Sequence, residues 1–105
     1  MTPNKWELWW ADVAFEDDPT QSKVRPVLVV APDVAYILSL YVTTKDARKH
    51  VEGDYEIRYW SESGLPTPST IRTAKKLRLV ATDFSKKIGR LHHADARAVM
   101  KLLEK

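Results

Sequence analysis

The first 44 residues contain three stretches of strand-forming side chains, and only short connections separate them. These stretches are residues 6–15, 24–30 and 34–44. The first connection is polar and contains Pro19, and the second is only three residues long. Consecutive strands joined in this way predict an antiparallel meander, which restricts the fold class more than any other feature of the chain.

The alternation in the first stretch predicts which of its side chains enter the core. One face carries Trp9, Ala11, Val13 and Phe15. The other face carries Leu8 and Trp10, so we expect it to be a groove or a dimer surface. Trp9 is therefore predicted to pack in the core, whereas Trp10 is predicted to be free to stack on a nucleobase.

The remainder of the chain changes from strand to helix. Residues 55–60 alternate as a fourth strand, residues 61–69 are irregular, and residues 70–81 suggest one or two short strands. We expect a turn and a connector at residues 83–90. Apolar residues at three- and four-residue spacings predict an amphipathic helix in residues 91–105. The expected fold is one domain, residues 1–105, mainly β and closed by a C-terminal helix.

Composition and charge limit the classes of function. The chain has no cysteine, and no apolar run approaches the roughly 18 residues of a membrane helix, so we expect a cytoplasmic protein without a membrane partner. The net charge is +3, but residues 72–90 hold seven Lys or Arg and one acid. This asymmetry suggests a polyanionic partner, although a solvated basic face explains it equally well.

Motifs for metal and phosphate chemistry are missing from the sequence. There is no HExxH, no cysteine pair and no glycine-rich phosphate loop, so we expect neither a metal site nor a cofactor. The adjacent histidines His92 and His93 cannot easily bind one ion. His92 instead suits the start of the last helix, with Asp95 as the acidic partner of a capping box.

Arg25 lies directly before Pro26, at the entrance of the second strand. If the second and third strands are antiparallel neighbours, Arg25 lies near Thr43 at one end of the sheet. A guanidinium and a hydroxyl in this arrangement can hold a phosphate. A surface arginine beside an edge threonine is the alternative, and these residues alone favour this alternative.

Four segments, taken in order, resemble the MazF/PemK family of toxin endoribonucleases. They are WELWWADVAFEDDPTQSKVRPVLVV, LYVTTK, GLPTPSTIRTAKKL and KKIGRLHHADARAVMKLLEK. The resemblance implies a strongly twisted antiparallel sheet, described as a small SH3-like barrel. It also implies a homodimer and an antitoxin that blocks its RNA groove. Departures from the family pattern are Trp6-Glu7 for Gly-Asp, Tyr41 for Pro, the pair Lys75-Lys76, and His92-His93.

The resemblance implies sequence-specific, metal-independent cleavage of single-stranded RNA, with Arg25 and Thr43 as the catalytic pair. Attack by a ribose 2′-OH would leave a 2′,3′-cyclic phosphate and a 5′-OH end. Arginine stays protonated, so Arg25 suits charge stabilisation better than proton abstraction. The RNA-binding candidates are Trp10, Gln21, Lys23, Thr44, Lys45, His50, Lys75 and Lys76.

His50 is also a candidate general base, because histidine exchanges protons near neutral pH. Two other functions remain open at this point. One is a non-catalytic toxin of the same fold that binds a protein, as CcdB-like gyrase poisons do. The other is a nucleic-acid-binding module that uses the basic stretch at residues 72–90.

Overall fold

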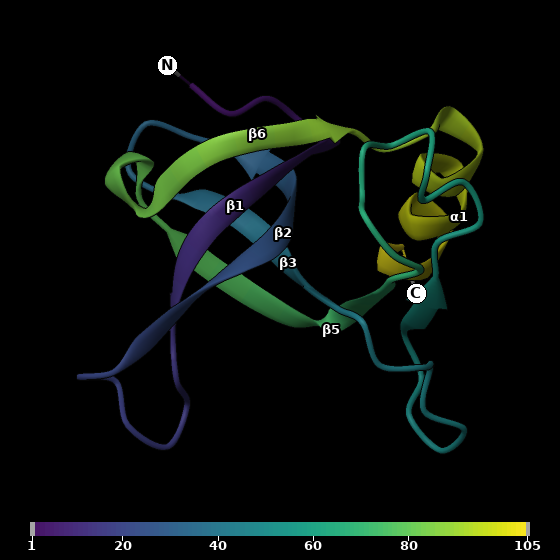
Figure 1. The fold of residues 1–105 in the computed structure, drawn as a ribbon, viewed down its shortest axis with the longest axis horizontal. Coiled ribbons are helices and arrows are strands. Elements are labelled where there is room, and N and C mark those ends of the chain that lie inside the picture. Colours follow the sequence, from purple (N-terminus) through teal and green to yellow (C-terminus); the bar gives the residue numbers. More distant parts are fainter. Residues whose placement is uncertain (1, 105) are drawn as a thin grey trace.

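The computed structural model describes residues 2–104, which form six strands, one 3₁₀ turn and one helix (Figure 1). In chain order the elements are β1 (Glu7–Ala14), β2 (Ser22–Pro32), β3 (Ile37–Thr43), β4 (Asp54–Glu56), β5 (Thr70–Leu79), η1 (Ala81–Asp83), β6 (Phe84–Arg90) and α1 (His93–Leu103). No helix among these residues is long and apolar enough to cross a membrane.

All six strands belong to one antiparallel sheet with the order β4-β5-β3-β2-β1-β6. The predicted meander is confirmed, because β1, β2 and β3 are consecutive neighbours. The sheet curls strongly, with β6 passing across the top of the view (Figure 1). It does not close into a barrel, since β4 and β6 remain its two edges. The predicted fold class, a twisted antiparallel sheet with a C-terminal helix, is confirmed.

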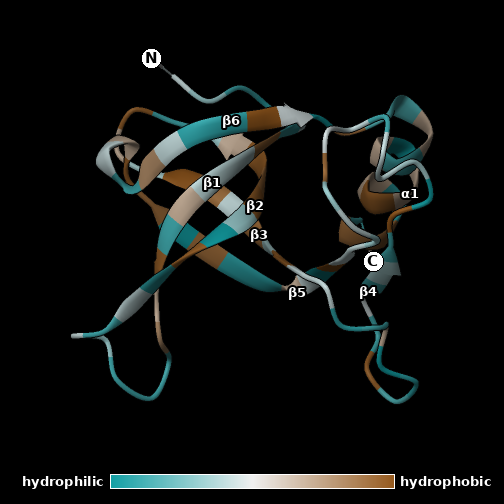
Figure 2. Ribbon diagram, in the orientation of Figure 1, coloured by the Kyte–Doolittle hydropathy of each residue, from teal (hydrophilic) through white to brown (hydrophobic). Residues whose placement is uncertain are grey.

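The two faces of the sheet bury two separate apolar clusters (Figure 2). The first cluster packs between the sheet and α1 and includes Leu8, Leu28 and Val99. The second lies on the opposite face, inside the curl, and includes Trp9, Val27 and Phe84. Trp9 is 2% exposed, as predicted for a core residue, and its ring meets Phe84 edge-on at 6.0 Å.

The face of β1 that carries Leu8 and Trp10 does not provide the expected surface along its whole length. Leu8 is fully buried because α1 packs over this end of the sheet. Trp10, two residues further along, is half-buried. Alternation identified the two faces correctly, but it carried no information about where the helix would dock.

The predicted strand at residues 55–60 is wrong beyond Glu56, because β4 is only three residues long. The cause is Asp95, whose fully buried carboxylate accepts hydrogen bonds from the backbone N–H groups of Arg58 and Tyr59, at 2.9 Å each, and from the Tyr55 hydroxyl. These contacts turn the chain toward the helix and away from the strand ladder.

The start of α1 is as predicted, but the predicted capping box is wrong. His92 is the N-cap, and its Nδ1 accepts from the Ala94 N–H at 3.1 Å. The Asp95 carboxylate does not accept a hydrogen bond from the His92 N–H, because it accepts from donors in residues 55–59. The His92 N–H instead donates to Ser63 Oγ at 3.1 Å, which ties the helix start to the irregular segment.

The connector expected at residues 83–90 is in fact strand β6, which pairs with β1 along the sheet edge. The sequence does not show the alternation of a strand here, because only Phe84 is buried and most other side chains are polar and exposed. Two register shifts interrupt the pairing with β1. An edge strand held by backbone hydrogen bonds needs no apolar alternation.

Trp6 has a φ of 71°, which is rare for a bulky side chain. It stands where the resembled family has glycine, the residue that adopts this conformation without strain. Its backbone is held on both sides: its N–H donates to Val29 O at 2.7 Å, and its carbonyl accepts from the Leu91 N–H at 2.8 Å. These bonds and packing of the ring against the first apolar cluster offset the strain.

Candidate active site

A cavity of about 200 Å³ opens where β2 begins and β3 ends, and we call it the Arg25 pocket. Its lining comes from β1, β2, β3 and the irregular segment before β5. The lining residues are Trp10, Lys23, Val24, Arg25, Pro26, Val42, Thr43, Thr44, Leu65, Pro66, Thr67 and Ser69. The predicted catalytic pair and three predicted RNA-binding residues therefore border one cavity.

The strand register explains why Arg25 and Thr43 meet at this cavity. The ladder between β2 and β3 ends at the pair Val27–Tyr41. Continued by two residues on each strand, the same antiparallel register places Arg25 opposite Thr43. Arg25 is half-buried, with its guanidinium carbon 5.2 Å from the centre of the Tyr41 ring. The ring thus supports the charge beside the cavity.

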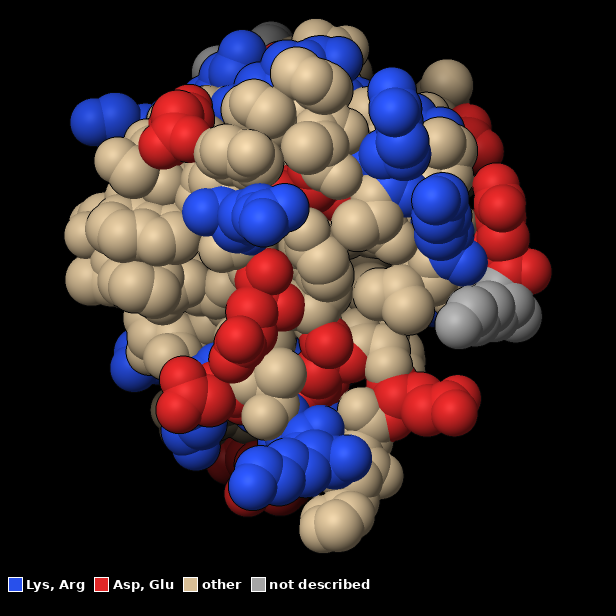
Figure 3. Space-filling view, turned by 90° about the vertical axis from the view of Figure 1, so that its right-hand side faces the viewer, with Lys and Arg blue, Asp and Glu red and all other residues tan. Residues whose placement is uncertain are grey.

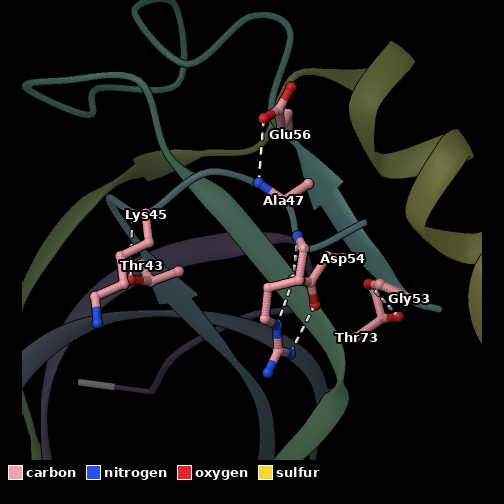
Figure 4. Close-up of polar contacts among 8 residues, drawn as sticks. Thr43, Lys45, Ala47, Gly53, Asp54, Glu56 and Thr73 are labelled. Atoms are coloured by element: carbon pink, nitrogen blue, oxygen red, sulfur yellow. Dashed lines mark hydrogen bonds and ion pairs between the residues drawn. The ribbon is translucent and has the colours of Figure 1, made fainter. Parts of the chain in front are cut away.

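Thr43 is buried, and its Oγ1 accepts a hydrogen bond from the Lys45 N–H at 3.3 Å (Figure 4). With Oγ1 as the acceptor, the hydroxyl proton remains available to donate toward a ligand. The chain after Thr43 is exposed, so this contact ties it back to the end of β3.

The loop between β3 and β4 is anchored at several further points (Figure 4). Arg48 donates hydrogen bonds to the Asp54 carboxylate from Nε at 2.8 Å and from a second guanidinium nitrogen at 3.0 Å. The hydrogen bonds from Arg48 are the main cause that lowers the pKa of Asp54. The Thr73 hydroxyl donates to Gly53 O at 2.7 Å. These contacts fix the loop that follows Thr43 onto β4 and β5.

The opposite wall of the pocket depends on a close approach of the irregular segment to β6. Gly64 has a φ of 93°, and a side chain on Gly89 would come within 2.2 Å of the Ser63 carbonyl oxygen. Only glycine fits at both positions. The contact sets the position of Leu65, whose buried side chain joins the first apolar cluster and lines the pocket.

Three of the eight predicted RNA-binding residues, Trp10, Lys23 and Thr44, line the pocket, and the other five do not. Lys23 and Thr44 are exposed lining residues. Gln21 lies at the base of the β1–β2 loop, where its backbone bonds to Asp18 and Phe15. Lys45 contacts Thr43 through its backbone N–H. His50 lies in an exposed turn and is not among the lining residues.

The predicted pair Lys75-Lys76 is divided between the two faces of β5. Lys75 lies with its Nζ 4.2 Å from the centre of the Tyr41 ring, on the side of Arg25. Lys76 lines a different cavity, which also borders Gly53 and the end of α1 at Leu103. Neighbouring residues of a strand point to opposite faces, so the structure associates only Lys75 with the Arg25 side.

The structure adds lining residues that the sequence analysis did not single out. Leu65, Pro66, Thr67 and Ser69 come from the segment 61–69, which was expected only to be irregular. Its two closely spaced prolines, Pro66 and Pro68, were the available signal of a rigid wall. Arg72 was counted in the basic stretch but not as a site residue, yet its guanidinium carbon lies 5.6 Å from the Tyr41 ring centre.

Charged side chains on the helix side of the molecule are mixed (Figure 3). Basic and acidic groups alternate over this face and do not form a single basic field. Within residues 2–104, no group of three or more His, Asp or Glu is placed to hold a metal ion. Arg25 borders both the Arg25 pocket and the ring of Tyr41.

Comparison with known proteins identifies the family and the fold. A family model described as "PemK-like, MazF-like toxin of type II toxin-antitoxin system" matches residues 4–105. The Mycobacterium tuberculosis toxin MazF-mt6 superimposes with a TM-score of 0.70 at 18% identity, covering 92% of this chain and 91% of that toxin. A second structure, titled as an Mtb toxin, gives a TM-score of 0.63 at 16% identity, with coverages of 89% and 96%. No curated protein sequence matches at a significant level.

The two structural matches establish the fold, and the family model establishes the family. The segments that carry the sequence resemblance fall on β1 and β2, the end of β3, β5 with the segment before it, and β6 with α1. The chain belongs to the PemK-like, MazF-like toxins of type II toxin–antitoxin systems.

Proposed function

We propose that this toxin is a metal-independent, sequence-specific endoribonuclease that cleaves single-stranded RNA at the Arg25 pocket. The observation that carries the proposal is that Arg25 and Thr43, at the ends of the neighbouring strands β2 and β3, line one cavity. Endonuclease activity is general in this family, which supports the assignment. The family also implies an antitoxin partner.

The proposed reaction needs no group beyond the RNA itself to form the new bond. The 2′-oxygen attacks the adjacent phosphorus, and the bond from phosphorus to the 5′-oxygen breaks. The products are a 2′,3′-cyclic phosphate and a 5′-OH end, and the proton lost by the 2′-OH is balanced by the proton gained by the leaving oxygen. DNA has no 2′-OH and should remain intact.

Arg25 stabilises the extra negative charge that the phosphoryl oxygens carry in the transition state. A fixed donor in such a position typically contributes about 2.7–4 kcal/mol. Thr43 donates its hydroxyl proton to the same phosphate or orients the 2′-OH. Among the described lining residues of the pocket there is no His, Asp or Glu, so charge stabilisation is the main contribution of this chain. The role of His50 as general base remains a prediction.

We further propose that the active form is a homodimer whose RNA groove includes the Arg25 pocket of each copy. The pocket is small in one chain, at about 200 Å³, and a second chain would extend the surface available to RNA. Sedimentation analysis of the purified toxin tests this proposal. A monomer at the concentrations that cleave RNA would contradict it.

The ends of the cleaved RNA test the proposed chemistry. A long, mostly unstructured RNA is incubated with the toxin in EDTA, beside the same sequence carrying 2′-O-methyl groups. We expect discrete fragments with 5′-OH and cyclic phosphate ends from the first RNA and none from the second. Intact RNA in both would favour a toxin that binds a protein target. Salt-sensitive binding without cleavage would favour a binding module.

A further inference from the structure

Three cations converge on the ring of Tyr41, which is 8% exposed. Lys75 Nζ lies 4.2 Å from the ring centre, and the guanidinium carbons of Arg25 and Arg72 lie at 5.2 and 5.6 Å. Like charges repel, so such a group is costly unless the ring or an anion compensates it. Tyr41 is also a residue at which this chain departs from the family it resembles.

The fold builds this cluster from two strands that flank β3. Arg72 on β5 is the direct partner of Tyr41 in the ladder. Arg25 on β2 lies two residues before Val27, the partner of Tyr41 on the other side. The register of β5 shifts between the partners of Leu40 and Tyr41, and Lys75 lies within this bulge. The bulge thus directs Lys75 onto the same face as Arg72.

The cluster is short of negative charge. Lys75 pairs with Glu16 at 3.0 Å, but the Glu16 side chain, in the connection between β1 and β2, is 77% exposed. Asp54, the ladder partner of Arg72, forms an ion pair with Arg48. The charge of Arg72 also acts on Asp54, but Asp54 is shared with Arg48, so the cations of this region outnumber the two nearby carboxylates.

Arg72 also has an unused donor. Its Nε is the one buried side-chain nitrogen or oxygen in residues 2–104 without a hydrogen-bond partner. A buried donor without a partner is costly, and a ligand that accepts from it recovers this loss. The guanidinium fork suits a phosphate in particular.

We infer that Arg72 and Lys75 bind a second phosphate of the RNA strand, next to the scissile phosphate at Arg25, with Tyr41 as the shared support. The inference rests on the proposed function for the identity of the strand. Arg25 borders both the pocket and the Tyr41 ring, so the two phosphates lie on either side of it. Arg72 and Lys75 are positioning residues that hold the RNA in register.

The test measures binding of a fluorescent, uncleavable 2′-O-methyl RNA of mixed sequence, by anisotropy, over a range of salt concentrations. Arg72→Gln and Lys75→Gln should each weaken binding about 10-fold and lower the slope of log affinity against log salt by about 0.7. Arg78→Gln is the matched control, because Arg78 lies on the same strand and stacks on Tyr36, at 5.0 Å. It should leave both quantities close to wild type.

Circular dichroism and thermal melting check that each variant is folded. If Arg72→Gln does not fold, Lys75→Gln and Tyr41→Leu decide the matter, since both should weaken binding in the same way. Equal effects of Arg72→Gln and Arg78→Gln would overturn the inference, as would a wild-type protein that does not bind the RNA. Arg72-dependent binding of poly-L-glutamate in place of RNA would also overturn it, in favour of an acidic peptide.

Cleavage of ordinary RNA by the wild type is measured separately and reports on the proposed function. If the toxin cleaves RNA but Arg72→Gln and Lys75→Gln leave the salt dependence of binding unchanged, only the second phosphate site is overturned. Absence of cleavage, with the effect of Arg72→Gln on binding intact, overturns only the proposed reaction.

Discussion

Pro26 explains, at the scale of single residues, why a charged side chain can precede a buried strand. It has no N–H to donate, and the ladder between β2 and β3 stops at Val27, the residue beside it. Beyond that point the ends of the two strands are not joined by the ladder. Arg25 and Thr43 therefore border an open pocket while the following residues of β2 are buried.

Thr43→Val tests the hydroxyl, since valine keeps the shape of threonine and removes the donor. We expect the cleavage rate to fall about 10- to 150-fold, which corresponds to a hydrogen bond to a charged group worth about 1.5–3 kcal/mol. The measurement is the single-turnover rate on a defined RNA. Thr82→Val, in the exposed η1 turn, is the control and should cleave at the wild-type rate. Equal cleavage rates for Thr43→Val and Thr82→Val would show that the Thr43 hydroxyl does not contribute to the reaction.

Glu7 predicts a pH-dependent contribution to stability. Burial tends to raise its pKa, but hydrogen bonds from Lys87, Asn4 and Trp9 outweigh burial and lower the pKa to about 2. A carboxylate with a lowered pKa stabilises the fold above its unfolded pKa, near 4.5, and loses this effect as the pH falls toward 2.

Glu7→Gln should therefore lower the free energy of unfolding by about 1–2 kcal/mol at pH 7. The difference from wild type should shrink steadily between pH 4.5 and pH 2. Urea unfolding at several pH values measures it, with the exposed Glu52→Gln as the control. A difference that does not change with pH would show that the charge of Glu7 is not the cause.

At the scale of elements, Asp95 joins α1 to the end of β4. Its two carboxylate oxygens accept from three donors in residues 55–59. Burial is the main cause that raises the pKa of Tyr55, and the hydrogen bond to Asp95 adds to it. The helix is thus fixed to the sheet through a buried polar contact as well as through apolar packing.

Asp95→Asn should leave at least one of these donors facing an amide N–H in place of an oxygen. We expect a loss of about 1–3 kcal/mol in the free energy of unfolding and faster hydrogen exchange at the amides of Arg58 and Tyr59. Asp46→Asn, in an exposed loop, should change neither quantity. Unchanged exchange at the two amides in Asp95→Asn would mean that the carboxylate does not hold this segment.

Element by element, the sequence predicted what apolar alternation and helical periodicity encode. Strands β1, β2, β3 and β5 and the helix lie close to their predicted ranges. The edge strand β6 was not predicted because it is held mainly through its backbone. The end of β4 was not predicted because it depends on Asp95, which contacts Arg58 across 37 residues of sequence. Contacts between distant residues leave no periodic signal in a single sequence.

At the scale of the whole molecule, the same limit applies to the site. Arg25 and Thr43 were predictable as neighbours because one strand register relates them. Which of Lys75 and Lys76 lies on the side of Arg25 was not predictable, since it depends on the bulge in β5. The wall formed by residues 65–67 depends on a glycine contact with β6, which no local pattern indicates.

The most direct test of the account is the rate at which the purified toxin cleaves a long, unstructured RNA in EDTA, compared with Arg25→Ala and Arg78→Ala. We predict that wild type and Arg78→Ala cleave at similar rates, and that Arg25→Ala is slower by at least about 10²–10³-fold while remaining folded. A folded Arg25→Ala protein that cleaves RNA at the wild-type rate would contradict the central claim, and Arg25 would then be a structural residue of the sheet end.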